Sequence, residues 1–385
     1  MSQSIADPFH KYKVWVLVPH LETDDPNLQY YYDFSQSLKE YTQVFAELGA
    51  QWQWQPITME NIPQTISEIR KQSNGQLPLV INLCDGDEIN GTPGISVIHE
   101  LEKQKLAYTG SDASFYTITT SKIPMKQAFD QAGVPTPKWA VIDGEEQAIK
   151  SICRKIGTPI IIKPAISGGS MGVSIKNVVH SEEELLSRVY ELNTGYRGWQ
   201  LTTGGLLAEE FIKGPEFTSL IVGSSDHPDE CIVYEPVERV FHESLPDNEK
   251  FLSFDRLWEI YENESPMPNN ENFYNYIPVK EPLSSAVKEI SLKAYCAVGG
   301  KGYGRLDIRM EALTGNLYVL EVNAQCGLSE DENYTSIGAI LKVSNLSYTE
   351  IIAEILKDAL RRSIVKPVVV KKVRPSKARK SVSVK

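Results

Sequence analysis

The sequence predicts an α/β protein made of three units. This prediction rests on the length of 385 residues, on the alternation of strand and helix patterns along the chain, and on the places where that alternation changes. A chain of this length is typical of two or three domains. Hydrophobic residues make up 41% and charged residues 23%, as in ordinary globular proteins, so disorder and coiled coil are not expected for the bulk of the chain.

The first unit, residues 12–115, is predicted to contain a Rossmann-like parallel sheet. Strand patterns at 13–18, 52–57 and 79–83 alternate with helix patterns at 34–48 and 94–103, and a short segment at 106–110 follows. Apolar residues of the first helix recur every three or four positions, and Gly49 stands where a C-terminal cap is expected. Alternating strands and helices imply parallel strands with right-handed crossovers.

The other two units are predicted to be α+β, a small central one at 116–205 and a larger C-terminal one at 206–362. The central unit has helix patterns at 119–132, 145–156 and after the capping box at 181–184, and strand patterns at 139–142, 159–164 and 173–177. The C-terminal unit has strand patterns at 206–211, 218–222, 231–240, 304–310 and 317–323 and a helix pattern at 284–298. Its polar, aromatic insert at 241–276 is long enough to be a lid.

Charge is unevenly placed along the chain. The net charge of −11 divides into +8 for residues 366–385, which contain no acid, and −19 for the rest. So acidic a body does not suit a nucleic-acid or anionic-membrane binder, and only the tail at 363–385, which we expect to be disordered, could attract either. No apolar run has the length of a membrane span. Five scattered cysteines and a polar N-terminus favour a cytoplasmic protein.

A glycine-rich loop, SGGSMG at 167–172, follows the predicted strand at 159–164. Its backbone N–H groups are unobstructed by side chains, as in loops that wrap phosphate oxygens, and Lys163 is placed to reach a phosphate. Because a strand pattern follows, the loop is neither a Walker A sequence nor a dinucleotide fingerprint. Taken alone, the loop is more simply explained as a hairpin turn.

Two late strands carry charged residues at alternate positions. Alternate side chains share one face of a strand, so neighbouring strands would present Asp307, Glu321 and Asn323 together, with Arg305 beside them. Such oxygen ligands suit Mg²⁺ bound to nucleotide phosphates. A solvated face of an amphipathic strand pair is the alternative. In the segment 209–218, Glu209 and Glu216 are candidates for adenine and ribose contacts, although each alone is more often a surface carboxylate.

The order of these segments resembles the ATP-grasp superfamily and, within it, the D-alanine–D-alanine ligases. The matching segments are SK at 121–122, IIIKP at 160–164, SGGSMG at 167–172, EEFIKGPEFT at 209–218, GYGRLDIR at 302–309 and YVLEVNAQCGL at 318–328. The resemblance implies a three-unit ATP-grasp architecture and an ADP-forming carboxylate–amine ligase. In such an enzyme a carboxylate takes the γ-phosphate of ATP, and an amine then displaces phosphate from the acyl phosphate.

The resemblance also implies roles for individual residues. The residues that it assigns to phosphate binding are Lys122, Lys163, Gly168, Gly169, Ser170, Gly172 and Lys250. Those that it assigns to adenosine binding are Glu209, Phe211, Ile212, Glu216 and Leu320. It assigns two Mg²⁺ ions, or Mn²⁺ in their place, to Asp307, Glu321 and Asn323. Arg305, Lys163 and backbone N–H groups near Gly327 would act on the reacting groups. A homodimer through the first domain is implied as well.

The substrate region departs from the family pattern. Asp85 stands where the family has histidine, and Glu22 matches the family's amino-group-binding glutamate only loosely. Thr335 or Ser336 would replace the serine that binds a carboxylate. We therefore expect a ligase that joins an amino acid or a related small metabolite but not two D-alanines. The alternatives are a genuine cell-wall D-alanine–D-alanine ligase and a catalytically inactive nucleotide-binding regulatory protein.

Overall fold

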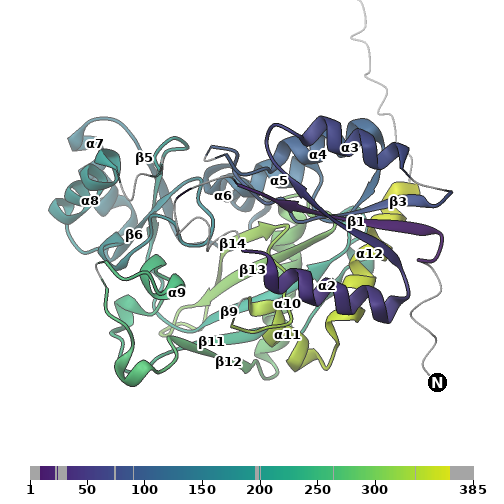
Figure 1. Ribbon diagram of the computed structural model, residues 1–385. Coiled ribbons are helices and arrows are strands. Elements are labelled where there is room, and N and C mark those ends of the chain that lie inside the picture. The colour runs from purple at the N-terminus through teal and green to yellow at the C-terminus, as the bar shows by residue number, and fades with distance from the viewer. Residues whose placement is uncertain are drawn as a thin grey trace, which may run out of the picture.

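Three sheets organise the chain (Figure 1). The computed structural model describes residues 9–21, 24, 33–72, 75–89, 91–195, 199, 201–262, 264–333 and 335–364. Glu22 and the basic tail at 366–385 lie outside these residues, so what the sequence predicts for them stays a prediction. Within the described part of the chain, no helix has both the length and the apolar character needed to cross a membrane.

The first sheet is parallel, with the strand order β2-β1-β3-β4. Its strands are β1 (Tyr12–Pro19), β2 (Gln51–Ile57), β3 (Leu77–Asn82) and β4 (Ala107–Tyr108), and its helices are α2 (Ser35–Leu48), α3 (Ile62–Lys71) and α4 (Ile95–Gln104). The parallel pairing confirms the predicted Rossmann-like pattern, and Gly49 caps α2 in the left-handed conformation. Helix α3 has no counterpart among the elements predicted from the sequence.

Strand β1 is buried on both faces, as expected for a parallel strand covered by helices on two sides. Val14 and Val16 pack with α2 and with α12 (Tyr348–Ile364), whereas Trp15 and Leu17 pack with α3 and α4. The last helix of the chain therefore covers the first sheet, next to α2 (Figure 1). The N-terminal and C-terminal segments consequently share one hydrophobic core.

The central sheet is antiparallel, with the strand order β5-β8-β6-β7. Its strands are β5 (Trp139–Ile142), β6 (Ile160–Pro164), β7 (Val178–Val179) and β8 (Leu206–Glu210), and the helices of this region are α5 (Ala113–Thr120), α6 (Lys122–Ala132), α7 (Glu146–Ile156) and α8 (Glu182–Thr194). Strand β8 belongs to this sheet, so the boundary predicted at residue 206 falls inside the central unit and is better placed after Glu210.

The segment 173–177 does not form the predicted strand. It ends in the short 3₁₀ helix η1 (Ile175–Asn177). The amide of Asn177 donates to the carbonyl oxygens of Ile162 at 2.6 Å and Gly172 at 2.8 Å, which folds the segment back onto β6. The predicted cap at Ser181 is confirmed, because its hydroxyl accepts from the backbone N–H of Glu184.

The third sheet is antiparallel and has the order β12-β11-β9-β13-β14, with β10 paired to β9. Its strands are β9 (Glu216–Val222), β10 (Ile232–Val233), β11 (Val237–Phe241), β12 (Tyr274–Pro278), β13 (Tyr303–Met310) and β14 (Leu317–Ala324). Helices α10 (Leu283–Ala297) and α11 (Ser336–Ser344) pack against it. The insert between β11 and β12 contains the short helix α9 (Phe254–Trp258) and ends in β12, the edge strand of the sheet.

Gly302 packs against Gly110 where the first and third units meet. Its φ is +77°, and a Cβ there would lie 2.1 Å from the carbonyl oxygen of Gly110. We predict that Gly302→Ala lowers the free energy of unfolding by about 2–4 kcal/mol, because backbone strain and overpacking add. Urea denaturation measures this loss. Gly315→Ala is the control, since its φ of +74° is similar but no atom lies within 4 Å of the added Cβ; equal losses would contradict the prediction.

Candidate active site

A cavity of about 1200 Å³ lies where the three units meet. The described predicted site residues that line it are Asp85, Lys122, Lys163, Gly168, Gly169, Ser170, Glu209, Phe211, Ile212, Glu216, Arg305, Asp307, Leu320, Glu321, Asn323, Gly327, Thr335 and Ser336. Segments more than 200 residues apart in the sequence are thus brought to one space. The loop after β3, the glycine-rich loop, the segment after β8 and the strands β13 and β14 supply most of its walls.

Two predicted residues do not line this cavity. A Cβ on Gly172 would meet Leu201 and Pro164, so this glycine is packed within the central unit. The amine of Lys250 pairs with Asp247 at 2.8 Å, and the side chain is directed to the protein surface. The contact of Lys250 with phosphate that the resemblance implies stays a prediction.

Strands β13 and β14 place the predicted metal-binding side chains next to one another. Asp307 lies opposite Glu321, and Arg305 lies opposite Asn323. The Asp307 carboxylate accepts hydrogen bonds from Thr218 at 2.8 Å, from Arg305 at 3.0 Å and from the Asn323 amide nitrogen at 3.0 Å. Two carboxylates and an amide oxygen form a donor set that fits Mg²⁺. Among the described residues no group of three His, Cys, Asp or Glu side chains could hold a metal ion, and this set contains only two acids.

A β-bulge explains how Leu320 and Glu321 both face the cavity. Asp307 pairs with Glu321 and Ile308 pairs with Val319, so Leu320 is an extra residue in β14. An extra residue interrupts the alternation of faces along a strand. Simple alternation puts Leu320 on the face opposite Glu321, whereas with the bulge both residues line the same cavity.

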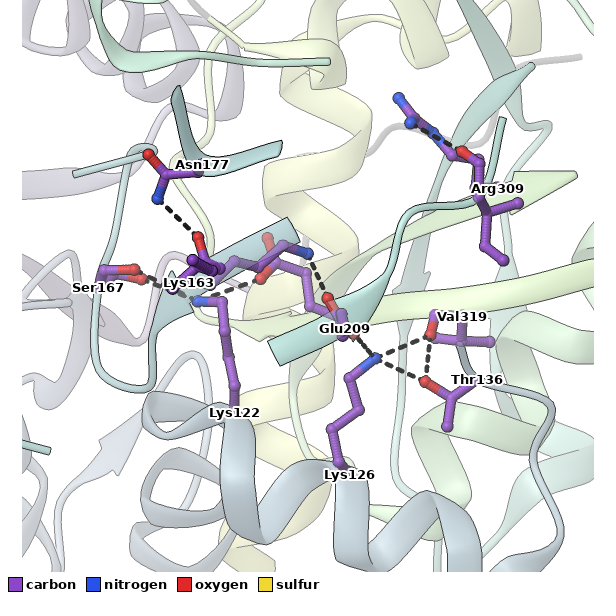
Figure 2. Close-up of polar contacts among 12 residues, drawn as sticks. Lys122, Lys126, Thr136, Lys163, Ser167, Asn177, Glu209, Arg309 and Val319 are labelled. Atoms are coloured by element: carbon purple, nitrogen blue, oxygen red, sulfur yellow. Dashed lines mark hydrogen bonds and ion pairs between the residues drawn. The ribbon is translucent and has the colours of Figure 1, made fainter. Parts of the chain in front are cut away.

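The buried carboxylate of Glu209 is held between two lysines (Figure 2). Lys163 and Lys126 both form ion pairs with it, and Lys126 also donates to the hydroxyl of Thr136 at 2.6 Å. Burial by itself raises the pKa of Glu209, but the charges of Lys126 and Lys163 outweigh burial and lower the pKa to about 2. Both carboxylate oxygens are engaged in ion pairs with lysines, and the predicted contact with an adenine amino group stays a prediction.

Lys126 was not among the residues predicted for the site. It lies one helical turn after Lys122 on α6, and this spacing of four residues is the signal that could have identified it. Burial lowers its pKa. For Lys163, burial also acts to lower the pKa, but the charge of Glu209 raises it overall, so this amine stays protonated.

A second buried network crosses the floor of the cavity on the third sheet. Glu216 forms ion pairs with Arg239 and with Arg309, the latter at 2.7 Å, and Arg239 donates to the hydroxyl of Tyr276 at 3.2 Å. These four residues are cross-strand neighbours on β9, β11, β13 and β12. Two arginines thus lie beside the carboxylate for which a ribose contact is predicted. Neither arginine was predicted as a site residue.

Thr335 and Ser336 lie at the start of α11 but differ in their contacts. The Thr335 hydroxyl accepts from the backbone N–H of Ile337 and so caps the helix. The Ser336 hydroxyl is buried, lines the cavity and has no hydrogen-bond partner among the described residues. Ser336 is thus the better placed of the two to bind a ligand.

The insert contacts the glycine-rich loop directly. The indole N–H of Trp258 donates to the carbonyl oxygen of Gly169 at 2.8 Å, and the backbone N–H of Phe254 donates to Val173 at 2.8 Å. The rings of Phe251 and Phe211 meet edge to face, with centroids 5.8 Å apart. The insert therefore covers the side of the cavity where the glycine-rich loop lies.

The Lys126→Met variant tests the buried network around Glu209. Breaking a buried ion pair costs about 3–5 kcal/mol, so we predict a loss of unfolding free energy of that size in chemical denaturation. Lys138→Met is the control. Its lysine pairs with Glu210 at 3.5 Å and is 65% exposed, so the loss should stay below about 1 kcal/mol. A loss for Lys126→Met as small as that of the control would show that the network does not stabilise the fold.

Comparison with known proteins identifies the relatives of this chain. The family model described as the D-Ala–D-Ala ligase C-terminus matches residues 128–357. The D-alanine–D-alanine ligase of Xanthomonas axonopodis pv. citri (strain 306) is 29% identical over 258 residues, which cover 66% of this chain and 70% of the relative. The same enzyme of Stutzerimonas stutzeri (strain A1501) is 25% identical over 260 residues, covering 68% and 71%.

Solved structures confirm the predicted three-unit ATP-grasp fold. The D-alanine–D-alanine ligase from Bacillus anthracis matches with a TM-score of 0.64 and 17% identity, covering 91% of this chain and 98% of that one. The VanG D-Ala:D-Ser ligase from Enterococcus faecalis matches with a TM-score of 0.62 and 17% identity, covering 92% and 99%. Since the family model spans more than half of the chain, this protein belongs to the D-alanine–D-alanine ligase family, ATP-grasp enzymes that join a carboxylate to an amine with release of ADP.

Proposed function

We propose that this enzyme joins two small amino acids and that D-alanine is the first candidate for both. The observation that carries the proposal is the convergence of Lys122, Lys163, Arg305, Asp307 and Glu321 on one cavity. The expectation that the substrates are not two D-alanines finds no support among the relatives, which favour the alternative of a D-alanine–D-alanine ligase. An inactive regulatory protein is disfavoured, because these charged groups are all retained.

The nucleotide would lie between the central and third sheets. Ile161, Val173, Phe211 and Phe251 form an apolar cluster on this side of the cavity, and Leu320 adds a further apolar surface for the adenine base. The amines of Lys122 and Lys163 and the backbone N–H groups of the glycine-rich loop would then hold the phosphates. Glu209 supports this role, because its ion pair fixes the amine of Lys163 at the cavity wall.

Asp307, Glu321 and Asn323 would hold the divalent cations, Mg²⁺ or Mn²⁺, which neutralise phosphate charge when bound. Asn323 donates to Asp307 through its amide nitrogen, which leaves its oxygen available as a ligand. Arg305 would neutralise the transferring phosphoryl group. Burial acts to lower its pKa, but Asp307 raises it overall, so the guanidinium remains charged throughout.

The substrate groups would be held at the opposite wall. The substrate carboxylate attacks the γ-phosphorus and releases ADP, and the incoming amine then attacks the acyl carbon of the acyl phosphate and displaces inorganic phosphate. The backbone N–H near Gly327 and the free hydroxyl of Ser336 would bind carboxylate or carbonyl oxygens. The homodimer implied by the resemblance stays a prediction, which sedimentation of the full chain would test.

Turnover tests this function. We predict that the full chain with MgATP and D-alanine releases ADP and forms a dipeptide, and that Glu321→Gln lowers kcat at least about 100-fold, because a charge-neutralising ligand is lost. EDTA should abolish turnover of the wild type. Glu289→Gln, which alters an exposed acid of α10, is the control and should leave kcat unchanged.

The same assay separates the two substrate hypotheses. Amino acids supplied singly and in pairs, D-serine included, would be ranked by ADP release coupled to product. Strong turnover with D-alanine alone would exclude the hypothesis of other substrates, whereas turnover restricted to another pair would exclude D-alanine. Retained activity of Glu321→Gln would contradict the metal assignment.

The insert provides a further prediction, since a lid over the acyl phosphate must exclude water. Trp258→Phe keeps the aromatic ring but removes the hydrogen bond to Gly169. We predict that this variant releases several phosphates for each dipeptide, whereas the wild type releases about one. Parallel phosphate and dipeptide assays measure the ratio. An unchanged ratio would show that this contact does not help to exclude water.

A further inference from the structure

The loop that follows β3 places Asp85 at the carboxyl end of the first sheet. Ligands of open parallel sheets bind at this edge. The backbone on both sides of Asp85 is fixed, since Gln325 donates to the carbonyl oxygen of Cys84 at 2.8 Å and the Tyr116 hydroxyl donates to that of Gly86 at 2.7 Å. The loop is thus held in place without use of the Asp85 side chain.

The carboxylate of Asp85 faces the cavity without a cation to balance it. The side chain is exposed to the cavity, and no lysine, arginine or histidine of the described residues pairs with it. By contrast, Asp307, Glu321 and Glu209 each contact at least one lysine or arginine. An unbalanced carboxylate on a cavity wall attracts a cationic group of the ligand.

Cys326 connects this carboxylate with the phosphoryl-transfer side of the cavity. The buried thiol of Cys326 lies within electrostatic range of Arg305, Asp307 and Asp85. Gln325, the residue before Cys326, donates to the carbonyl oxygen of Cys84, so the loop that carries Asp85 lies next to the segment that follows β14. An amine that approaches from the first sheet meets Asp85 before it reaches the acyl carbon.

We propose that Asp85 is a catalytic residue that binds the ammonium group of the second substrate and removes one of its protons. The proposal rests on the ligase function proposed above and adds a proton acceptor to it. The substrate class is a primary amine, such as the α-amine of an amino acid, whose pKa lies above 7, so that it enters protonated near neutral pH. An ammonium nitrogen has no lone pair with which to attack.

The step balances in protons and electrons. One proton passes from the ammonium to Asp85 and leaves a neutral amine and a neutral carboxylic acid. The nitrogen lone pair forms the C–N bond, and the C–O bond of the acyl phosphate breaks with its electrons on the departing phosphate. The second proton of the nitrogen goes to that phosphate, and Asp85 returns its own proton to water.

The pKa of Asp85 suits this task. Desolvation by the surrounding cavity walls raises it to about 6, with a further contribution from Asp87 and opposition from its own backbone N–H. A general base is most effective when its pKa lies near the operating pH.

The other titratable groups around Asp85 are either uncharged or accept hydrogen bonds from the backbone. Burial raises the pKa of Tyr116 from α5, of Tyr303 from β13 and of Cys326 after β14, so all three are uncharged near neutral pH. On the loop itself, Glu88 accepts from the backbone N–H groups of Gly94 and Ser96, and Asp87 accepts from that of Ile89.

The test compares Asp85→Asn with the wild type over a range of pH, with MgATP and the amino acid pair that gives most dipeptide. We expect kcat of the variant to fall about 100-fold at pH 7. Its rate should then rise about tenfold per pH unit toward the pKa of the amine, because the solution supplies the neutral amine. The wild type should lose activity only below about pH 6. An unchanged kcat, or a variant profile as flat as that of the wild type, would overturn the proposal.

Hydroxylamine distinguishes failure of this proposal from failure of the ligase function. It is a largely uncharged nucleophile near neutral pH and captures an acyl phosphate as a hydroxamate without a base. Asp85→Asn should form hydroxamate at the wild-type rate, and a loss of hydroxamate in this variant alone would overturn the proton-acceptor role. Absence of hydroxamate from the wild type would overturn the ligase function and this proposal with it. Glu60→Gln, at an exposed site of the first unit, should keep the wild-type pH profile.

Discussion

The Glu209 carboxylate can be buried only because two lysine amines lie against it. An ionised carboxylate without such partners would be far too costly inside a protein. Lys126 comes from α6 and Lys163 from β6, while Glu209 lies on β8, so the requirement for charge balance brings these three elements together. Thr136 extends the contact to the carbonyl oxygen of Val319 on β14, at 2.8 Å. The interaction that closes the central unit thus also aligns it with the strand that carries Glu321.

In the third sheet, buried charges are balanced by residues of opposite charge on neighbouring strands. Register places Arg239, Glu216 and Arg309 side by side on three strands, so each buried charge has a neighbour of opposite sign. The bulge at Leu320 then turns an apolar and an acidic residue toward one space. On a regular strand, consecutive residues face opposite sides of the sheet. Without the bulge, either the apolar surface for the adenine base or the proposed metal ligand would face the cavity, but not both.

Local patterns were enough to predict much of the fold and of the site. Strand alternation identified Asp307, Glu321 and Asn323 as neighbours, and the strand patterns of the first unit gave its parallel sheet. The residues that could not be predicted depend on contacts between distant segments. Arg239 becomes part of the cavity floor through the pairing of β11 with β9. Strand β8 belongs to the central sheet because it pairs with β6. The segment 173–177 ends in a 3₁₀ helix and does not form the predicted strand, because the side chain of Asn177 bonds to Ile162 and Gly172. Local periodicity does not reveal these hydrogen bonds.

The two ends of the cavity differ in how their charges are balanced. Around the proposed nucleotide site, lysines and arginines lie beside carboxylates, and these cations would bind the negative charge of ATP. The cations are Lys122, Lys126, Lys163, Arg239, Arg305 and Arg309, and the carboxylates are Glu209, Glu216, Asp307 and Glu321. At the end formed by the first sheet, Asp85 forms no ion pair with a lysine, arginine or histidine of the described residues. The proposed roles then place a phosphorylated carboxylate at one end and an ammonium group at the other, so the charges of the protein would orient the two groups that must react.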